Sequence, residues 1–271
     1  MRVEPIAAAT QAAALEYLDR SPFLNVFLAH LLTGDFGPAF IKNVLLAVDD
    51  GAVTGVAYCG RQVVIAAEPH AVPALAERIA ARGGVRMIIG PRDVVRAFWG
   101  LVAERYGRPR LIRDRQLVMA LERTGLRPYE ATVTVRNATL NDVRAVAESS
   151  ASMIRHELEY DPRRNSTSFD AGVRQMIEHK LWWVGVWDGR LCFFCNVGPW
   201  SKQTAQLQGI WTPPDLRRRG LAAASLGAIC DRLLGVFATL SLYVNDFNAP
   251  AVALYRRVGF ENVGDFMTIV F

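Results

Sequence analysis

Residues 206–224 read Gln-Leu-Gln-Gly-Ile-Trp-Thr-Pro-Pro-Asp-Leu-Arg-Arg-Arg-Gly-Leu-Ala-Ala-Ala, and this stretch decides the fold of the second half of the chain. Its first part alternates apolar and polar side chains, which predicts a strand. Pro213 and Pro214 end the strand, because proline has no amide to donate to a sheet. We expect Asp215 to cap a helix that follows from Leu216 to Leu234, since this segment is rich in good helix formers.

A basic turn lies between the predicted strand and the predicted helix, with the sequence Arg217-Arg218-Arg219-Gly220-Leu221-Ala222. The first turn of a helix has unpaired amide groups, and the peptide dipoles place partial positive charge there. The small side chains of Gly220 and Ala222 let a phosphate approach the backbone, and the arginines add charge and paired donors. The turn therefore predicts a phosphate site. The alternative is a solvated basic cluster at the start of a surface helix.

The spacing Arg217-x-x-Gly220-x-Ala222 after a strand resembles the acetyl-CoA pyrophosphate loop of the GNAT-type N-acetyltransferase superfamily. A second match follows in residues 242–260, Leu-Tyr-Val-Asn-Asp-Phe-Asn-Ala-Pro-Ala-Val-Ala-Leu-Tyr-Arg-Arg-Val-Gly-Phe. It is similar to the later GNAT motif of a strand, an Asn, a helix with Leu-Tyr, and Gly-Phe. The two matches come in the family order and cover roughly the last half of the chain.

This resemblance implies acetyl-CoA as a co-substrate. It implies that the pantetheine arm pairs with the backbone of the strand, that a backbone N–H near Gly209 or Ile210 polarises the thioester carbonyl, and that the turn holds the pyrophosphate. It further implies an Asn beside the pantetheine arm. The cofactor-binding residues implied in this way are Ile210, Trp211, Thr212, Arg217, Arg218, Arg219, Gly220, Leu221, Ala222 and Asn248.

Acetyl transfer to an amine requires a deprotonated nitrogen, stabilisation of the charge that develops on the carbonyl oxygen, and a proton for the departing thiolate. Tyr255 is the candidate acid, since GNAT proteins often place such a Tyr near the CoA sulfur and a neutral phenol can donate a proton. Asn248 and Tyr255 are seven residues apart, so both can face one side of a helix. The structural alternatives are a helix cap for Asn248 and an interfacial aromatic for Tyr255.

The general base is less clearly indicated by the sequence. Some family members carry a Glu on the fourth strand, whereas this strand offers Gln206 and Gln208, which cannot accept a proton at neutral pH. The other candidates are His156, Glu157 and Glu159, near the end of a predicted helix. Among them we select Glu157. A chain of water molecules, or an amine that is already partly neutral, would also suffice.

Composition sets broader limits on function. The 271 residues are 51% hydrophobic and 21% charged, which is typical of folded domains with a sizeable core. The net charge of +5 suits an anionic ligand such as CoA, and the chain lacks an aromatic-studded basic groove and zinc-finger spacing, so nucleic acid is not expected. We interpret Cys59, Cys192, Cys195 and Cys230 as buried free thiols, and we expect no metal site. No signal peptide or bilayer-length apolar run is evident, which favours the cytoplasm.

The predicted fold class is α/β (α+β), with two GNAT-like mixed-sheet domains in tandem and helices on both faces of each sheet. Residues 1–125 form a GNAT-like domain without the cofactor motif, which we expect to be non-catalytic, and residues 131–271 form the N-acetyltransferase domain. Residues 126–130 are the expected linker, since they contain Pro128. The alternative for the first half is an unrelated α/β packing domain.

Several local features follow from the pattern. Asp49-Asp50-Gly51 and Asp188-Gly189 predict hairpin turns, and Pro22 predicts a break in the helical segment 11–32. We expect residues 5–10 to lead into that segment, residues 34–38 to form a loop, Asn141 to cap a helix that ends near Leu158, and residues 161–168 to form a substrate loop. Helices are also expected over 72–82, 92–106, 170–179 and 250–258. The expected strands are 43–48, 53–59, 62–67, 85–89, 113–121, 131–138, 181–187, 191–197, 205–212 and 239–244, and 262–270 is expected to close the sheet of the second domain.

The leading hypothesis is an acetyl-CoA-dependent N-acetyltransferase acting on a primary amine of a small molecule or peptide. The second hypothesis is a non-catalytic acyl-CoA-binding regulatory module, which the missing strand carboxylate favours. A third is a nucleic-acid-associated protein that uses the arginine cluster. We expect no membrane partner and leave open whether the chain forms a homodimer.

Overall fold

The computed structural model describes residues 1–34, 41–158, 161–164 and 168–271. Its strands are β1 (Arg2–Pro5), β2 (Val44–Asp49), β3 (Ala52–Cys59), β4 (Gln62–Ala67), β5 (Met87–Pro91), β6 (Leu111–Glu122), β7 (Thr134–Asn137), β8 (Trp182–Trp187), β9 (Arg190–Trp200), β10 (Thr204–Trp211), β11 (Thr239–Asn245) and β12 (Glu261–Val270). Its α-helices are α1 (Gln11–Asp19), α2 (Pro22–Thr33), α4 (Val72–Ala80), α5 (Arg92–Tyr106), α6 (Val143–Leu158), α7 (Ser168–Glu178), α8 (Leu221–Leu233) and α9 (Ala249–Val258). None of these helices is both long and apolar enough to cross a membrane.

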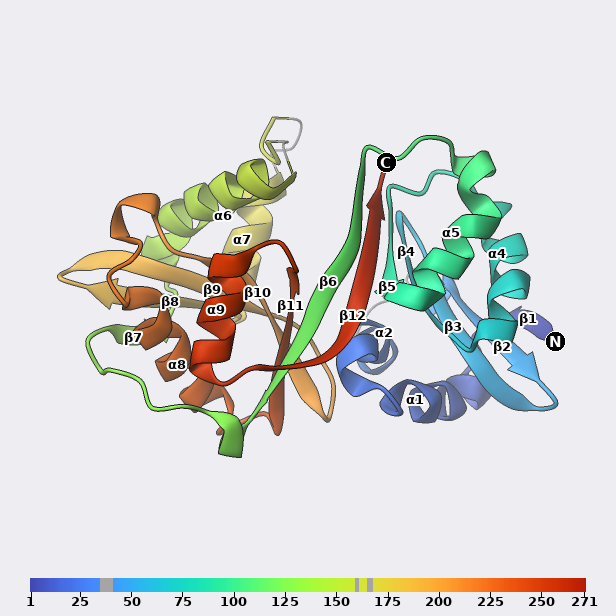
Figure 1. Cartoon of the computed structure of the whole chain (residues 1–271), viewed down its shortest axis with the longest axis horizontal. Helices are drawn as coiled ribbons and strands as arrows, with labels where there is room; N and C mark the ends of the chain where they lie inside the picture. Colours follow the sequence, from blue (N-terminus) through green and yellow to red (C-terminus); the bar gives the residue numbers. More distant parts are fainter. Residues whose placement is uncertain (35–40, 159–160, 165–167) are drawn as a thin grey trace.

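All of these strands join in one mixed sheet with the order β1-β2-β3-β4-β5-β12-β6-β11-β10-β9-β8-β7. The order is a near-palindrome: each half supplies its first five strands in sequence, and two long strands lie between them. Figure 1 shows these two strands, β6 and β12, side by side at the centre of the molecule. The predicted fold class is therefore confirmed, and the sheets of the two halves are joined edge to edge.

The two central strands are exchanged between the halves. The C-terminal strand β12 pairs with β5 of the first half, for example Ile269 with Ile88. Strand β6, from the first half, pairs along β11 of the second half, for example Met119 with Leu242. The expectation that 262–270 closes the sheet of the second domain is thus corrected: β12 lies between β5 and β6.

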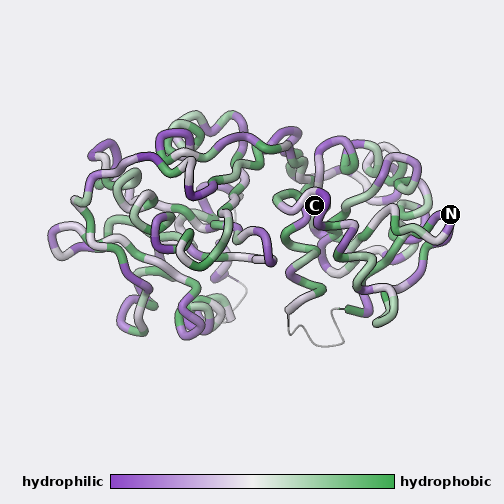
Figure 2. Tube along the Cα trace, turned by 90° about the horizontal axis from the view of Figure 1, so that it is seen from below, coloured by the Kyte–Doolittle hydropathy of each residue, from purple (hydrophilic) through white to green (hydrophobic). Residues whose placement is uncertain are grey.

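Helices cover both faces of the sheet, as adjacent residues on single strands show. Phe193 packs with α8 and α9, whereas Phe194 packs with α6 and α7. Ile88 packs with α4 and α5, whereas Ile89 packs with α1 and α2. Val118 lies with α1 and α2, opposite the α8–α9 cluster that contains its neighbours, so α1, α2, α6 and α7 share one face. The other face carries α4, α5, α8 and α9, and in Figure 2 apolar segments lie within both halves.

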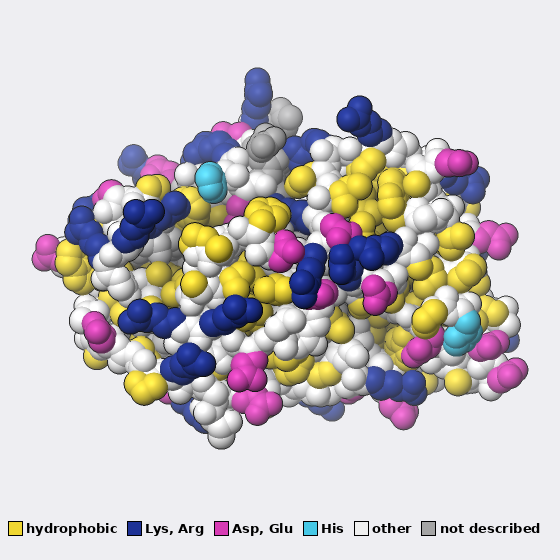
Figure 3. All heavy atoms as spheres, in the orientation of Figure 1, with side chains coloured by type: hydrophobic (Ala, Val, Ile, Leu, Met, Phe, Trp, Pro, Cys, Tyr) yellow, Lys and Arg dark blue, Asp and Glu magenta, His cyan; other side chains and the backbone are white. Residues whose placement is uncertain are grey.

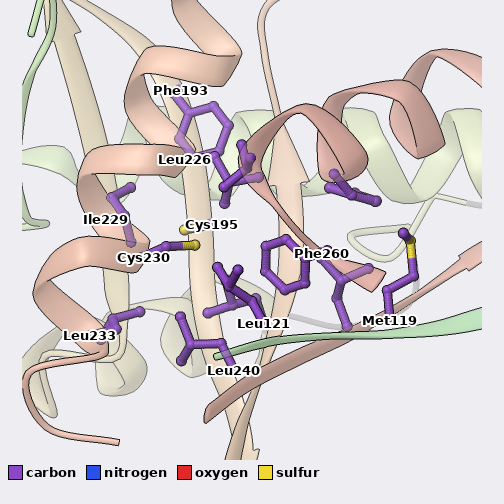
Figure 4. Close-up of a cluster of buried hydrophobic side chains, with 14 of the residues drawn as sticks. Met119, Leu121, Phe193, Cys195, Leu226, Ile229, Cys230, Leu233, Leu240 and Phe260 are labelled. Atoms are coloured by element: carbon purple, nitrogen blue, oxygen red, sulfur yellow. The ribbon is translucent and has the colours of Figure 1, made fainter. Parts of the chain in front are cut away.

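The largest apolar cluster lies under α8 and α9. Figure 4 shows Phe193 of β9, Leu226 and Ile229 of α8, and Phe260 directed into it. Met119 and Leu121 of the exchanged strand β6 are also members and are almost fully buried. The exchanged strand β6 therefore contributes buried side chains to the core of the second half, in addition to its backbone hydrogen bonds.

Two helix caps differ from those expected. Helix α8 begins at Leu221 and not at Leu216, because Gly220 is its N-cap, while Asp215 lies in a preceding 3₁₀ turn. Before α6, Thr139 donates to Asp142 from its amide and its hydroxyl, in place of a cap by Asn141. These carboxylate bonds give the turn the same support as a capping box.

Other local predictions are confirmed or corrected by the described residues. Asp50, Gly51, Asp188 and Gly189 have positive φ angles, as the hairpin turns require. Residues 2–5 form strand β1, which the expected lead-in segment did not include. The predicted loop at 34–38 lies mostly outside the described residues, as does part of the predicted substrate loop at 161–168.

The four cysteines are buried and free, as expected. Burial raises the pKa of Cys59 to about 12 and also raises the pKa of Cys192, Cys195 and Cys230. In the part of the chain that the structure describes, no three His, Cys, Asp or Glu side chains are gathered so that they could hold a metal ion.

The predicted linker lies against α8. The hydroxyl of Tyr129 donates to Asp231 at 2.9 Å, and a Cβ on Gly227 would meet the Tyr129 side chain at 2.8 Å. Gly259, at the end of α9, approaches Gly125 so closely that a Cβ would meet its carbonyl. Residues 125–129 are therefore held against the helices of the second half.

Candidate active site

The basic turn before α8 presents its backbone to solvent. Arg218 and Gly220 have φ angles of 61° and 78°, which turn the chain sharply into the helix. Among the described residues, no acceptor pairs with the amides of residues 218–223, and residues 217–220 are exposed. Figure 3 shows Lys and Arg side chains gathered on this half of the face that carries α8 and α9. Open amides at a helix N-terminus and nearby cations form an anion cradle.

Trp211, the last residue of β10, links this cradle to α6. The guanidinium of Arg217 lies 4.5 Å from the ring centroid of Trp211, and its Nε donates to the carbonyl of Thr212 at 3.1 Å. The ring of His156, near the end of α6, lies 6.2 Å from Trp211 in an edge arrangement. Arg219 lies 5.7 Å from the ring of Trp187. These cation–π contacts orient two of the three arginines without neutralising them.

Strands β10 and β11 stop pairing halfway along their length. Their parallel ladder ends at Gln206 and Ser241, although β10 continues to Trp211 and β11 to Asn245. Gly209, with a φ of 61°, lies within an irregularity in the pairing of β10 with β9. Ile210 is half-buried against the core of the α8–α9 face. The backbone edge of β10 beside these residues is thus left without β11 as a partner.

Tyr255 lies in α9 with 7% of its surface exposed and contacts Phe260, with ring centroids 6.1 Å apart. Burial raises the pKa of its phenol, and the charge of Glu157 raises that pKa further. Within the described residues its hydroxyl has no hydrogen-bond partner. Tyr255 is therefore a neutral phenol whose proton is not used by the protein.

Glu157 lies in the last turn of α6, on the opposite face of the sheet from α9. It is exposed to solvent, and desolvation by the surrounding protein nevertheless raises its pKa. The positive charges of Arg113 and His156 counteract part of this rise. The charge of Glu157 contributes to the raised pKa of Tyr255, and the catalytic roles of both residues stay predictions.

Asn248 caps α9, since its Oδ1 accepts from the amide of Ala251 at 3.3 Å. The capping role is therefore observed, and the predicted contact with pantetheine stays a prediction. Leu221 is buried and Ala222 half-buried at the start of α8, so they contribute backbone to the cradle and not charge.

Sequence reasoning did not identify Arg113, a half-buried residue of β6. Its Nη2 donates to the backbone carbonyl of Glu157 at 2.9 Å. Nearby, Gln116 donates to Asn245 at 3.0 Å and accepts from Thr268 at 2.5 Å, which joins β6, β11 and β12 by side chains. No local pattern marks these residues, because strand exchange brings β6 beside β11.

A pocket of about 270 Å³ adjoins the cradle. Gly220, Ala223 and Gly227 line it from α8, while Arg257 and residues 127–130 line the other side. It therefore extends the cradle away from β10, with a further cation at its rim.

The described residues of the first half do not reproduce the features of this site. A Cβ on Gly90 would lie 2.3 Å from the carbonyl of Ile65, so β4 and β5 remain pressed together beyond their last paired residues. Helix α4 is preceded by Glu68 and Pro69, an anion and a residue without an amide, where α8 has the basic turn. Phe98 stands seven residues after the N-cap of α5, the spacing at which Tyr255 follows Asn248. These differences accompany the absence of the cofactor motif from the sequence of the first half, and its expected non-catalytic role stays a prediction.

Two family models match different parts of the chain. Residues 148–260 match the acetyltransferase (GNAT) family, and residues 43–146 match a domain of unknown function, DUF4081. No curated protein matches the chain in sequence.

Solved structures resemble the whole chain. A Drosophila protein aligns at a TM-score of 0.73 and 13% identity, covering 99% of this chain and 98% of its own. A GNAT-family acetyltransferase from Colwellia psychrerythraea aligns at 0.61 and 13%, covering 100% of both chains. A tandem GNAT protein from the clavulanic acid biosynthesis pathway aligns at 0.51 and 15%, covering 98% and 97%. At these identities the likeness concerns the fold.

Proposed function

The C-terminal half of this chain is a GNAT acetyltransferase domain, and we propose that it transfers the acetyl group of acetyl-CoA to a primary amine. The open amides of residues 218–223 bind the pyrophosphate, with Arg217, Arg218 and Arg219 supplying charge. The adjoining pocket with Arg257 accommodates the nucleotide end of CoA. The pantetheine arm pairs with the free edge of β10 at Ile210, Trp211 and Thr212.

The acetyl transfer itself uses two side chains. Glu157 accepts a proton from the ammonium form of the acceptor, and its raised pKa brings the carboxylate closer to the basicity that this step needs. The neutral amine attacks the thioester carbonyl, the carbon–sulfur bond breaks, and Tyr255 donates its proton to the departing thiolate. The new amide nitrogen then loses its second proton to the Tyr255 phenolate through solvent, and Glu157 releases its proton to water, which restores both side chains. An amide of β10 near Gly209 stabilises the oxyanion.

The observation that carries this proposal is the end of the β10–β11 ladder at Gln206 and Ser241, together with the helix N-terminus of α8, whose first amides have no acceptor among the described residues. A thermal-shift titration with CoA and acetyl-CoA tests binding, since a ligand of the native state raises the melting temperature. Release of free thiol in the presence of a broad amine panel tests transfer. The absence of both effects would refute the proposal. The four buried free cysteines are compatible with a reducing cytoplasm, which we propose as its location.

The alternative is a non-catalytic acyl-CoA-binding regulatory module. The side chains of Gln206 and Gln208 favour it, since Gln208 donates to Gln206 at 2.8 Å and neither offers a carboxylate. Stabilisation by acetyl-CoA without thiol release for any amine in the panel would support this module over the enzyme.

A further inference from the structure

The Arg113 side chain contacts Glu157, but the guanidinium and the carboxylate form no ion pair. The charge of Arg113 lowers the pKa of Glu157, yet the contact between the two residues runs from the guanidinium to the Glu157 backbone carbonyl. Among the described residues, Arg113 has no carboxylate within ion-pair distance. It therefore keeps unused donors beside the proposed base.

Two arginines near Arg113 in the chain or beside Glu157 form ion pairs with carboxylates, whereas Arg113 forms none among the described residues. Arg115, two residues along β6, pairs with Asp265 at 2.9 Å. Arg155, two residues before Glu157 in α6, pairs with Asp161 at 2.9 Å. A half-buried guanidinium that has lost part of its hydration without gaining a carboxylate is a ready site for one.

The position of Arg113 also fits the acceptor and not the cofactor. In β6, Gln116 pairs with Phe266 and Arg113 pairs with Thr268, so Arg113 shares a face with Gln116. Gln116 is opposite Asn245, on the face that carries α2 and α6. The phosphate cradle belongs to α8, on the other face, so Arg113 and the cradle lie on opposite sides of the sheet.

We propose that the acceptor is an amino-acid-like zwitterion, whose amine meets Glu157 while its carboxylate is bound by Arg113. This rests on the proposed acetyltransferase function and narrows its substrate class. An ammonium and a carboxylate in one molecule complement the charge pair, whereas an uncharged group beside the amine leaves Arg113 unpaired. The exchanged strand β6 thereby makes the first half a contributor to the specificity of the second.

The test compares amino acids with their carboxamides in wild type, Arg113→Gln and Arg113→Lys, measuring thiol release. Glutamine can still donate to the Glu157 carbonyl but carries no charge. We expect Arg113→Gln to raise KM for the amino acids by about 10- to 100-fold, as loss of a charged hydrogen bond predicts, with little change for the carboxamides. Arg113→Lys should recover part of the loss. Because each substrate is compared between variants, differences in amine pKa cancel.

Arg115→Gln is the matched control, since it removes a cation from the same strand and should leave the amino-acid-to-carboxamide ratio unchanged. Equal loss for both substrate types in Arg113→Gln would overturn the zwitterion proposal while leaving acetyl transfer intact. If no substrate causes thiol release, the test uses binding instead: the melting temperature of the CoA complex is measured with added amino acids and with added carboxamides. Stabilisation by amino acids over carboxamides that disappears in Arg113→Gln supports the binding role, and its absence refutes it.

Discussion

Glu157 and Tyr255 belong to helices on opposite faces of the sheet, yet the charge of Glu157 raises the pKa of the Tyr255 phenol. The strands between the two helices also separate, since the shared ladder of β10 and β11 ends at Gln206 and Ser241, before the strands themselves end. Each group also keeps the protonation behaviour that acetyl transfer needs: a neutral phenol to donate, and a carboxylate with a raised pKa to accept.

Tyr255→Phe should lower kcat for thiol release by about 100-fold or more, as loss of a general acid predicts, and should leave acetyl-CoA affinity unchanged. The melting temperature should not fall, because the hydroxyl has no partner among the described residues. Tyr106→Phe is the matched control: it removes a hydroxyl that donates to the carbonyl of Ile79 in the first half, so kcat should be retained. A Tyr255→Phe enzyme with wild-type kcat would exclude the proposed acid.

Glu157→Gln should remove the rise of kcat with pH that the ionisation of Glu157 produces in the wild-type enzyme. Desolvation raises the pKa of Glu157, so wild-type kcat should increase as pH rises through that pKa and then level off. The variant should have a low kcat without that ionisation. A pKa that is higher in the native state than in the unfolded state means that the native state favours protonated Glu157. The native state therefore loses stability as pH rises through this pKa. The Glu157→Gln variant, which cannot ionise, should be at least as stable as wild type at pH 7. If kcat of wild type and of Glu157→Gln depends on pH in the same way, a residue other than Glu157 is the base.

The variants Gly220→Asp and Gly220→Asn have side chains of the same size at the anion cradle and differ in charge, so their comparison isolates the effect of charge on CoA binding. Asn and Asp both tolerate the positive φ at this position, and a Cβ here meets nothing within 4 Å. The Asp variant should bind CoA at least about 10-fold more weakly than the Asn variant, because a carboxylate repels the pyrophosphate. The difference should narrow as salt concentration increases. Calorimetric titration measures it, and equal affinities would place the pyrophosphate elsewhere.

Local sequence predicted much of the fold. The bounds of α5 agree with the sequence because the helical pattern runs uninterrupted from Arg92 and ends at Gly107. Both predicted hairpins carry positive φ at Asp-Gly, which is a requirement of two adjacent residues. The basic turn and Tyr255 were also identified from local motifs, and the structure places the basic turn at the N-terminus of α8 and Tyr255 in α9.

Strand partners could not be predicted in the same way. Both β6 and β12 contain apolar residues that would suit either half, and pairing depends on contacts between distant segments. Arg113 remained unrecognised for that reason, since nothing in residues 111–122 indicates that this strand borders β11. The start of α8 was placed too early because a helical pattern does not reveal that Gly220 adopts a left-handed conformation.

Asp142 should support the native state only above acidic pH. Hydrogen bonds from Arg136, partly offset by desolvation, lower its pKa from 3.8 to about 2. A lowered native pKa gives stability that is present above pH 3.8 and is lost as pH falls toward 2. Asp142→Asn should therefore lower the free energy of unfolding by about 1–2 kcal/mol at pH 7, a value reduced for the solvent exposure of Arg136. The effect should vanish near pH 2.

Denaturant titrations of wild type and Asp142→Asn at several pH values check this. Glu178→Gln is the control, because Glu178 forms an exposed pair with Arg174 that should contribute little. A stability difference for Asp142→Asn that is the same at every pH would contradict the ion-pair explanation and assign the effect to packing.

Strand exchange predicts that the two halves do not fold independently. A fragment of residues 1–125 lacks β12, so β5 keeps β4 but loses its other partner, and the core loses Met267 and Ile269. A fragment of residues 126–271 lacks β6, which exposes the edge of β11 and removes Met119 and Leu121 from the core under α8 and α9. Each fragment alone should aggregate or show no cooperative unfolding. Co-expressed, they should form a stable one-to-one complex, because both exchanged strands are then present. Gel filtration and thermal unfolding followed by circular dichroism distinguish the cases. A cooperative melt of residues 126–271 alone, near that of the full chain, would show that β6 is dispensable for the second half.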